Sequence, residues 1–399
     1  MRLQRFSQRT GWDLTETEWA RRLRERRAAG LPILDLTASN PTHCGFDYDA
    51  QGTLAALGNP ASLDYDPDPK GLRLARAGVA GYYADHGATV DLEHVFLTTS
   101  TSEAYSFLFR LLCDPGDEVL IAQPSYPLFD FLADLNDVRL VPYPLFYDCG
   151  WHLDPEALRL RITSRTRAIA VVHPNNPTGH FTKPAERAVM EQLCADHGLA
   201  LIVDEVFLDY SLAHRSAETE AQSFAGGDHP VLTFVLSGLS KVAALPQMKA
   251  AWIICQGPTR DLQNALERLD VIADTFLSMN APIQWALPHW MAGRAEIQAQ
   301  ILARVRTNLA TLDHQLGSQS VISRLAIEAG WYVVLRIPAT QSDAQTAFSL
   351  LEQYGVAIHS GGFFGFRDTG WLGASLLGVE SEFRNGISQI AAHLKRIHD

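Results

Sequence analysis

The chain has 399 residues, 47% of them hydrophobic and 20% charged, which is enough to bury the cores of more than one folding unit. Its formal net charge of -12 argues against nucleic acid and against anionic membrane surfaces as main partners. No apolar run approaches the roughly 20 residues that span a bilayer. These features favour a protein that acts on small molecules.

The compartment expected from the sequence is the cytoplasm. The amino terminus has no apolar secretory core, and acidic residues such as Asp13 and Glu25 interrupt an arginine-rich start that otherwise suggests a transit peptide. The five cysteines have neither paired nor metal-ligand spacing, which is typical of reduced, buried thiols, and no metal site is expected.

Apolar, β-branched runs alternate with helical patterns between residues 66 and 260, which predicts an α/β domain with a mostly parallel sheet covered on both faces. Seven strands are expected, within VFLTTS at 95, EVLIAQP at 118, RLVPYPL at 139, AIAVVHP at 168, ALIVDEV at 200, TFVLSGLS at 233 and AAWIICQ at 250. In such sheets ligands bind beyond the carboxyl ends of the strands. The polar motifs below all fall at such ends.

A second, smaller α+β domain is expected after the sheet. Long amphipathic stretches such as Ala295 to Leu316 precede strands in IEAGWYVVLRIP, VAIHSG and WLGASLL, and a helix from about Ser381 to Arg396 closes the chain. We predict a large domain of residues 46–285 and a small domain that combines residues 1–45 and 286–399.

The sequence SGLSK at 237–241 places Lys241 just after an apolar strand, beside Ser237 and Ser240. A lysine in partly apolar surroundings has a depressed pKa and can act as an amine nucleophile. Taken alone, a lysine of this kind is more often a solvated surface residue, and the motifs that precede Lys241 give it its weight.

Asp204 ends the strongly hydrophobic strand in ALIVDEV, where a carboxylate needs a cation or a hydrogen-bond donor as partner. A protonated pyridine nitrogen is such a partner, and an N-cap or a magnesium ligand are the alternatives. No Walker A sequence accompanies Asp204, which weakens the magnesium reading.

Two loops complete the pattern. HPNNPTG at 173 presents Asn176, whose amide can donate to a phenolate oxygen, although a plain turn also explains it. TTSTSEA at 98 opens a helix with a capping box of Ser100 and Glu103, and the free amides there suit a phosphate or are simply a helix start.

Together these ordered motifs resemble the fold type I pyridoxal-phosphate (PLP) enzymes, the class I/II aminotransferases, over nearly the whole chain. The resemblance implies a PLP-transferase fold, with Lys241 as the Schiff-base (internal aldimine) lysine and Asp204 as the partner of the pyridine nitrogen. It further implies that Thr101 and Ser102 bind the phosphate, that Tyr126 stacks on the ring and that Asn176 bonds O3′.

By the same resemblance, Tyr65 in YDPDPKG reaches the phosphate of a neighbouring subunit, which implies a homodimer with shared active sites. The stretches SRLAIEAGWYVVLRIP, FSQRTGWDLTETEW and DLTASNPT are similar to an alanine-aminotransferase-like branch.

Three positions depart from the family pattern. Phe207 replaces a tyrosine that bonds O3′, a loss of about 1 kcal/mol that we expect to raise the aldimine pKa without loss of the cofactor. Lys249 replaces an arginine on the phosphate, so that Ser237 and Ser240 carry more of its binding. Gly373 replaces the arginine that grips the substrate carboxylate.

The loss of a buried bidentate pair at Gly373 costs roughly 2 to 5 kcal/mol, so either another cation acts there or the substrate lacks the usual carboxylate. Arg336 is the first candidate replacement and Arg367 the second, although surface or structural roles also explain both. Asn40 in SNPT is a further candidate for contact with the substrate.

The function that follows from the resemblance is transfer of an amino group between an amino acid and a 2-oxo acid. The same constellation also serves a PLP lyase or decarboxylase, because the orientation of the substrate decides which bond breaks. A regulatory protein that keeps the fold is a third reading, disfavoured because Lys241, Asp204 and Asn176 are all present and the net charge is negative.

Overall fold

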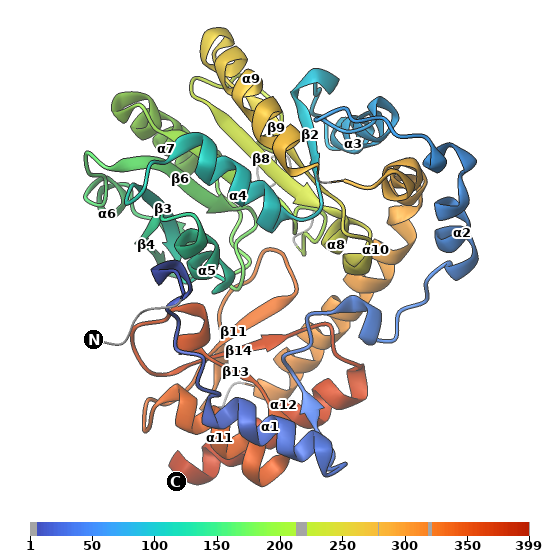
Figure 1. Cartoon of the computed structure of the whole chain (residues 1–399). Coiled ribbons are helices and arrows are strands. Elements are labelled where there is room, and N and C mark those ends of the chain that lie inside the picture. The colour runs from blue at the N-terminus through green and yellow to red at the C-terminus, as the bar shows by residue number, and fades with distance from the viewer. Residues whose placement is uncertain (1–5, 213–221, 278, 318–320, 399) are drawn as a thin grey trace.

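The computed structural model describes residues 6–212, 222–277, 279–317 and 321–398 (Figure 1). An eight-stranded sheet forms the centre of the larger part, in the order β2-β9-β8-β7-β6-β3-β4-β5. The five strands from β8 to β4 run parallel, and β9, β2 and β5 pair antiparallel at the two sides. The bounds are β2 Val95–Thr98, β3 Glu118–Gln123, β4 Arg139–Tyr147, β5 Trp151–Leu153, β6 Thr166–Val172, β7 Ala200–Asp204, β8 Thr233–Gly238 and β9 Ala251–Gln256.

The sheet has one strand more than the seven expected. All seven predicted runs form strands, and the additional strand is β5, which pairs with the end of β4. Its three residues, Trp151–Leu153, are too few to show an alternating pattern. This segment is a strand because it pairs with β4, and its local sequence does not predict it.

Both faces of the sheet are buried, as the near-continuous apolar runs predicted. Successive residues alternate between two cores: Ile254 packs on one face with Val203, and Ile253 on the other with Phe234. The helices of the first core are α3 Arg73–Asp85, α7 Pro184–His197 and the start of α10, and those of the second are α4 Thr101–Leu112, α5 Leu128–Leu135 and α9 Thr259–Phe276.

The smaller part has its own core around a four-stranded sheet in the order β10-β11-β14-β13. The strand pairs of this sheet are antiparallel, and a separate parallel pair joins β1 to β12. Helix α12 spans Glu380–His398, close to the stretch predicted. The other bounds are β1 Leu34–Asp35, β10 Ser323–Arg324, β11 Tyr332–Arg336, β12 Val356–Ala357, β13 His359–Ser360, β14 Trp371–Ser375, α1 Glu18–Ala28 and α11 Asp343–Tyr354.

The long helix α10, Ala281–Leu316, contributes to both parts (Figure 1). Ile283 near its start lies in a core of the large sheet, whereas Val305 lies in the core of the small one. The amphipathic stretch predicted from Ala295 is thus the second half of this helix, which contains Pro288. The predicted boundary at 285 and 286 falls inside α10, and the division into two domains stays a prediction.

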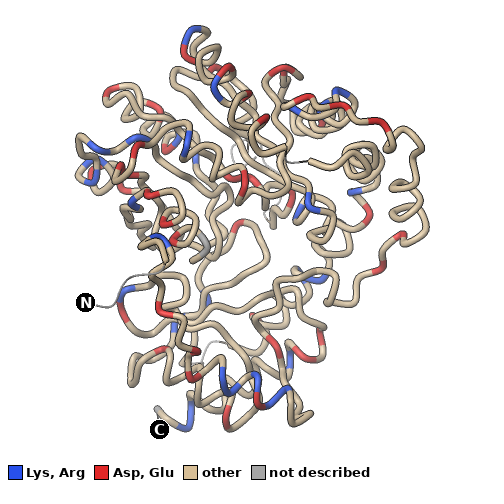
Figure 2. Tube along the Cα trace, viewed as in Figure 1, with Lys and Arg blue, Asp and Glu red and all other residues tan. Residues whose placement is uncertain are grey.

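Charged residues are spread over both parts of the molecule with the two signs interspersed (Figure 2). In the described part of the chain, no helix combines the length and apolarity that a membrane crossing requires.

A close backbone contact at Gly179 ties the loop after β6 to the segment that leads into β11. Gly179 has a φ of +68°, and a Cβ atom there would lie 2.4 Å from the carbonyl oxygen of Ala329. Beside it, the Glu328 carboxylate accepts from the Phe181 amide at 2.9 Å and pairs with Lys183. These contacts fix the position of the residues that follow Ala329.

We expect Gly179→Ala to lower stability by about 2 to 5 kcal/mol, because it combines left-handed backbone strain with overpacking against a rigid backbone. The matched control is Gly198→Ala, which has a φ of +66° but no heavy atom within 4 Å of the new Cβ and should cost about 1 to 2 kcal/mol. Thermal unfolding of the two variants measures the difference. Equal losses would show that the Gly179 contact is not tight in solution.

Candidate active site

One cavity of about 270 Å³ opens at the carboxyl ends of the parallel strands. The structure gathers there most of the residues predicted from the motifs, although they are spread over 140 positions of the chain. The predicted residues that line it are Thr101, Ser102, Tyr126, Asn176, Asp204, Ser240 and Lys241.

Strand ends deliver these side chains. Asp204 is the last residue of β7, and Lys241 lies in the short helix α8, Leu239–Val242, which follows β8 directly. Thr101 begins α4 after β2, and Asn176 and Tyr126 lie in the loops after β6 and β3. Because neighbouring parallel strands end at one edge of the sheet, residues distant in sequence converge there.

The start of α4 is built for an anion. The Ser100 hydroxyl accepts from the Glu103 amide at 3.1 Å, and the Glu103 carboxylate accepts from the Thr99 amide at 2.7 Å. This confirms the cap at Ser100, with the return bond going to Thr99 in place of Ser100. The first amides of α4, at Thr101 and Ser102, point along the helix dipole toward the cavity edge that these residues line.

Asp204 is buried, and burial raises the pKa of its carboxyl to about 6. The backbone amide of Val206, which donates to Oδ1 at 3.1 Å, opposes this shift, as do the Tyr105 hydroxyl and the charge of Lys241. The Tyr105 hydroxyl is itself buried and has no partner of normal hydrogen-bond geometry among the described residues. The Asp204 carboxylate can therefore accept a further hydrogen bond from a bound ligand.

Lys241 borders the same cavity, and loss of solvent lowers the pKa of its amine to about 8, while the charge of Asp204 opposes the shift. The Tyr210 hydroxyl donates to the Lys241 carbonyl at 2.6 Å and anchors the backbone of α8. Near neutral pH a fraction of such lysine side chains is unprotonated, and the free amine can attack a carbonyl carbon.

Aromatic rings surround the Lys241 amine. Its Nζ lies 4.8 Å from the ring centre of Trp331 and 5.7 Å from that of Phe207, and these two rings meet edge to face at 5.2 Å. Phe207 stands where the family pattern has a tyrosine. A ring face therefore lies near the amine, and the hydroxyl of the family pattern is missing. Such faces attract an ammonium by about 0.5 to 2 kcal/mol.

The residues that sequence reasoning missed come mainly from outside the large sheet. Trp331 and Tyr332 reach the cavity from β11 and the turn before it, Ser39 from the amino-terminal segment and Tyr105 from α4. The stretch around Trp331 was noticed for its family resemblance, but no local pattern indicates that it meets Lys241 from 90 residues away.

Six other predicted residues do not line this cavity in the single chain. Ser237 is buried within β8 and its hydroxyl donates to the Glu205 carbonyl at 3.5 Å, on the opposite face of the strand from Leu236. Lys249, with a φ of +54°, ends a short turn after Lys241, and Tyr65 is 81% exposed. The roles predicted for Ser237, Lys249 and Tyr65 stay predictions.

The three substrate candidates lie near the surface. Asn40 caps a short helix, where its Oδ1 accepts from the Thr42 amide at 3.1 Å. Arg336 places its guanidinium 4.2 Å from the ring centre of Trp371, and Arg367 donates to the Gln123 side chain at 3.2 Å. Arg336 ends β11, four residues after Tyr332, which carries it about 13 Å along the strand from the cavity wall.

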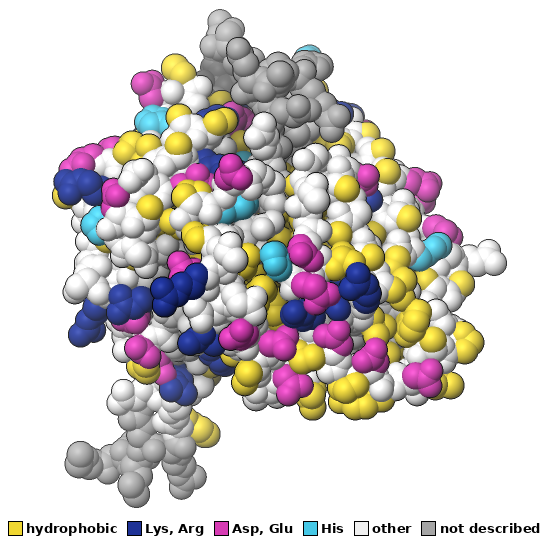
Figure 3. Space-filling view, turned by 90° about the horizontal axis from the view of Figure 1, so that it is seen from above, with side chains coloured by type: hydrophobic (Ala, Val, Ile, Leu, Met, Phe, Trp, Pro, Cys, Tyr) yellow, Lys and Arg dark blue, Asp and Glu magenta, His cyan; other side chains and the backbone are white. Residues whose placement is uncertain are grey.

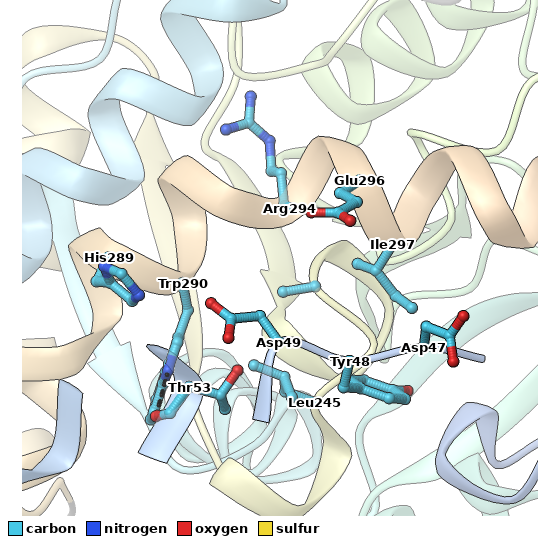
Figure 4. Close-up of a pocket in the computed structure, with 11 residues that line it drawn as sticks. Asp47, Tyr48, Asp49, Thr53, Leu245, His289, Trp290, Arg294, Glu296 and Ile297 are labelled. Carbon is cyan, nitrogen blue, oxygen red and sulfur yellow. Dashed lines mark hydrogen bonds between the residues drawn. The ribbon is translucent and has the colours of Figure 1, made fainter. Parts of the chain in front are cut away.

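A second, smaller hollow of about 70 Å³ lies between α10 and the segment around Asp49 (Figure 4). The Trp290 indole donates to the Thr53 carbonyl at 3.1 Å, and the Tyr48 hydroxyl donates to the Ala244 carbonyl at 2.9 Å. The Tyr48 bond braces the turn after Lys241, and the Trp290 bond ties α10 to the segment around Asp49. The hollow is therefore part of the support behind the main cavity.

Comparisons with known proteins agree with this geometry. Residues 59–390 match the family described as aminotransferase class I and II, and the chain belongs to that family. It is similar to a glutamate-pyruvate aminotransferase of Haemophilus influenzae, with 30% identity over 68% of this chain and 67% of that one. An alanine aminotransferase of Mycobacterium tuberculosis is 32% identical over 69% and 64% of the two chains, and an arginine-pyruvate transaminase of Pseudomonas aeruginosa is 28% identical over 98% of each.

The fold is also similar to that of a known aminotransferase. An alanine aminotransferase structure from Pyrococcus furiosus superimposes with a TM-score of 0.86 at 22% identity, covering 98% of this chain and 100% of that one. The fold is that of the fold type I enzymes, and the protein is a PLP-dependent aminotransferase.

The coupling of Asp204 to Lys241 predicts a measurable shift. Asp204→Asn removes the negative charge that raises the pKa of the Lys241 amine, so its midpoint should fall below the wild-type value of about 8. The measurement is the pH dependence of reductive methylation of Lys241 in the apoprotein, followed by mass spectrometry. Glu205→Gln is the control, because that buried carboxylate accepts from Ser223 and Phe224 and does not border the cavity. An unchanged midpoint in Asp204→Asn would contradict the coupling.

Proposed function

We propose that Lys241 holds PLP through its Nζ atom and that the enzyme transfers an amino group between an amino acid and a 2-oxo acid in this cavity. The observation that carries the proposal is that the buried Asp204 and the half-buried Lys241 border one cavity, at the end of β7 and just after β8. When bound, PLP supplies an aldehyde for the substrate amine and a pyridinium ring that accepts electrons from the bond being broken.

The residues around the cavity fit this cofactor from end to end. The amides of Thr101 and Ser102 suit the phosphate, Tyr126 offers a ring for stacking and Asn176 an amide for the phenolate oxygen. The Oδ1 atom of Asn176 is buried without a partner among the described residues, so this side chain is not committed to the protein. Asp204 takes the ring nitrogen, whose N–H supplies the donor that the carboxylate lacks.

The two ionisable groups then have separate tasks. Asp204 is ionised above a pH of about 6 and holds a proton on the ring nitrogen. Lys241, once its Nζ is free, takes a proton from the reacting carbon of the substrate and returns it on the other side of the C–N bond. A pKa of about 8 lets the amine do both near neutral pH.

The same residues would serve a PLP lyase or decarboxylase. Transamination is the better supported reaction, because the relatives that the chain resembles in sequence include a glutamate-pyruvate aminotransferase, an alanine aminotransferase and an arginine-pyruvate transaminase.

Lys241 has a direct spectroscopic test. Purified wild-type protein should show the visible absorbance of a lysine-bound cofactor and lose it when a donor amino acid is added, with a 2-oxo acid formed. Lys241→Ala should lack that band and lose at least about a thousandfold in turnover, since the amine both binds and moves the proton. Lys395→Ala, an exposed lysine on α12 outside the cavity, is the control and should keep the band. A band that persists in Lys241→Ala would refute the assignment.

We further propose a cytoplasmic homodimer in which Tyr65 reaches the phosphate in the partner subunit. Tyr65 and Leu277 line one surface hollow, and both side chains are exposed. Figure 3 shows that hydrophobic side chains gather toward one side of the upper face of the molecule. The exposed apolar residues near Tyr65 in sequence or at the end of α9 are Leu54, Leu63, Val271, Phe276 and Leu277. An exposed set of this size favours a partner, and the five unpaired cysteines suit a reducing compartment.

Shared sites predict complementation between two inactive variants. An equal mixture of Lys241→Ala and Tyr65→Ala, refolded or exchanged together, should regain about 25% of wild-type activity, since half of the dimers contain one intact site. Each variant alone is the control, and light scattering gives the oligomeric state. A monomer, or a mixture as inactive as its components, would exclude shared sites.

A further inference from the structure

A phenylalanine ring occupies the space beside Gly373 on the small sheet. A Cβ atom on Gly373 would lie 2.4 Å from Cε2 and 3.2 Å from Cδ2 of Phe364. The Phe364 side chain is buried, packs edge to face against Tyr332 at 5.8 Å, and lies edge to face with Phe363 at 4.9 Å. Any side chain at position 373 would therefore have to displace this ring.

Gly373 belongs to the face of the sheet that meets the cavity. Tyr332, which lines the cavity, pairs with Ser375, and alternate residues of a strand share a face, so Gly373 lies on the same face two residues away. The backbone of Phe364 also reaches the large sheet, because its carbonyl accepts from the Ser125 amide at 3.0 Å. Phe364 is thus fixed between Gly373 and the loop that carries Tyr126.

The side chains that pack behind Tyr126 and Tyr332 on this side of the cavity are aromatic and neutral, although they do not line it themselves. Phe363 stacks on His359 at 4.1 Å and lies 6.3 Å from Tyr126, and burial lowers the pKa of His359 to about 4, so that its imidazole is uncharged. Among the described residues that line the cavity, Lys241 is the one cation, and it is committed to the cofactor. Arg336 and Arg367 are engaged with Trp371 and Gln123, as described above.

The donors that this chain itself leaves for a substrate are uncharged. The lining offers the hydroxyls of Ser39 and Tyr332 and the indole of Trp331, whose Nε1 is buried without a hydrogen-bond partner among the described residues. Neutral hydrogen bonds of this kind contribute much less than a bidentate guanidinium–carboxylate pair.

We propose that Phe364 and Gly373 make the site indifferent to the α-carboxylate, so that primary amines with an apolar or aromatic side chain serve as amino donors beside the corresponding amino acids. The inference rests on the proposed transamination and extends its substrate class. The exchange is balanced without a further reactant: nitrogen passes from the amine to the oxo acid, the carbonyl oxygen passes the other way, and the amine becomes an aldehyde.

Matched donor pairs test the inference. The holoenzyme is mixed with phenylalanine or 2-phenylethylamine, and with leucine or 3-methylbutylamine, and the loss of the cofactor's visible band is followed in a single turnover at a series of concentrations. For each donor we take the ratio of the single-turnover rate constant to the dissociation constant. We expect this ratio to differ by less than about tenfold between the acid and the amine of each pair. A site that grips the carboxylate by an ion pair would favour the acid by about 30-fold or more, which would overturn the inference.

An equilibrium measurement separates recognition from chemistry. Competition by 3-phenylpropanoate and by 3-phenylpropanol, which carry no amine, should give dissociation constants within about tenfold of each other. Preference for the carboxylate by about 30-fold or more would again overturn the inference.

Paired variants test the two residues themselves. Phe364→Leu frees space beside position 373, and the double variant Phe364→Leu with Gly373→Arg adds a guanidinium there. We expect the single variant to keep the near-equal use of acid and amine, and the double variant to favour the acid by about 30-fold or more. If the double variant folds, as judged by its visible band, and yet keeps equal use, position 373 does not face the substrate and the inference is wrong. If the double variant does not fold, the wild-type pairs still decide.

The outcomes distinguish this inference from the proposed function. Conversion of the band by amino acids alone refutes the inference and leaves transamination in place. No conversion by any donor, with the band intact, refutes transamination, and the inference falls with it.

Discussion

The site depends on the removal of two opposite charges from water at the ends of neighbouring strands. Burial raises the pKa of Asp204 to about 6 and lowers that of Lys241 to about 8, and each charge partly offsets the cost of the other. The pair is therefore poised around neutral pH, where a carboxylate must stay ionised and an amine must both gain and lose a proton. In bulk water the carboxylate would also be ionised, but the amine, with an ordinary pKa of about 10.4, would stay protonated, so burial matters most for Lys241.

The large sheet makes this burial possible. Its parallel strands are covered on both faces, so that their carboxyl ends form one edge enclosed by loops and helix starts. At the same edge, the amides at the start of α4 attract an anion, whereas the Asp204 carboxylate attracts a cation. A cofactor with a phosphate at one end and a basic ring nitrogen at the other matches that arrangement of charge.

The small sheet closes the other side of the cavity with aromatic rings. Trp331 reaches the Lys241 amine because Gly179 and Glu328 hold the segment before β11 against the loop after β6. Phe364 is fixed in the same way between Gly373 and Ser125. On the proposed function, the chemistry depends mainly on residues of the large sheet, and we propose that the choice of substrate depends on where the small sheet places its rings.

The family resemblance added Thr101, Ser102 and Tyr126 to the predicted site. The sequence by itself determined the α/β class, seven strands of the sheet and the positions of Asp204, Asn176 and Lys241 beyond strand ends. It could do so because Asp204, Asn176, Lys241 and their companions directly follow apolar runs, and the rule that ligands bind at carboxyl ends needs only the order of strands and loops. Both are local properties of the chain.

Only the tertiary structure decided the rest. The alternation of β8 turned Ser237 away from the cavity, pairing with β4 made a strand of Trp151–Leu153, and the length of β11 carried Arg336 out of reach of the site. The ring of Trp331 lines the cavity and that of Phe364 packs behind Tyr332, and their positions depend on contacts with segments 90 to more than 200 residues away in the chain, which no local periodicity encodes. Packing between the two sheets fixes them, because a ring is placed by what it touches in space and not by its neighbours in sequence.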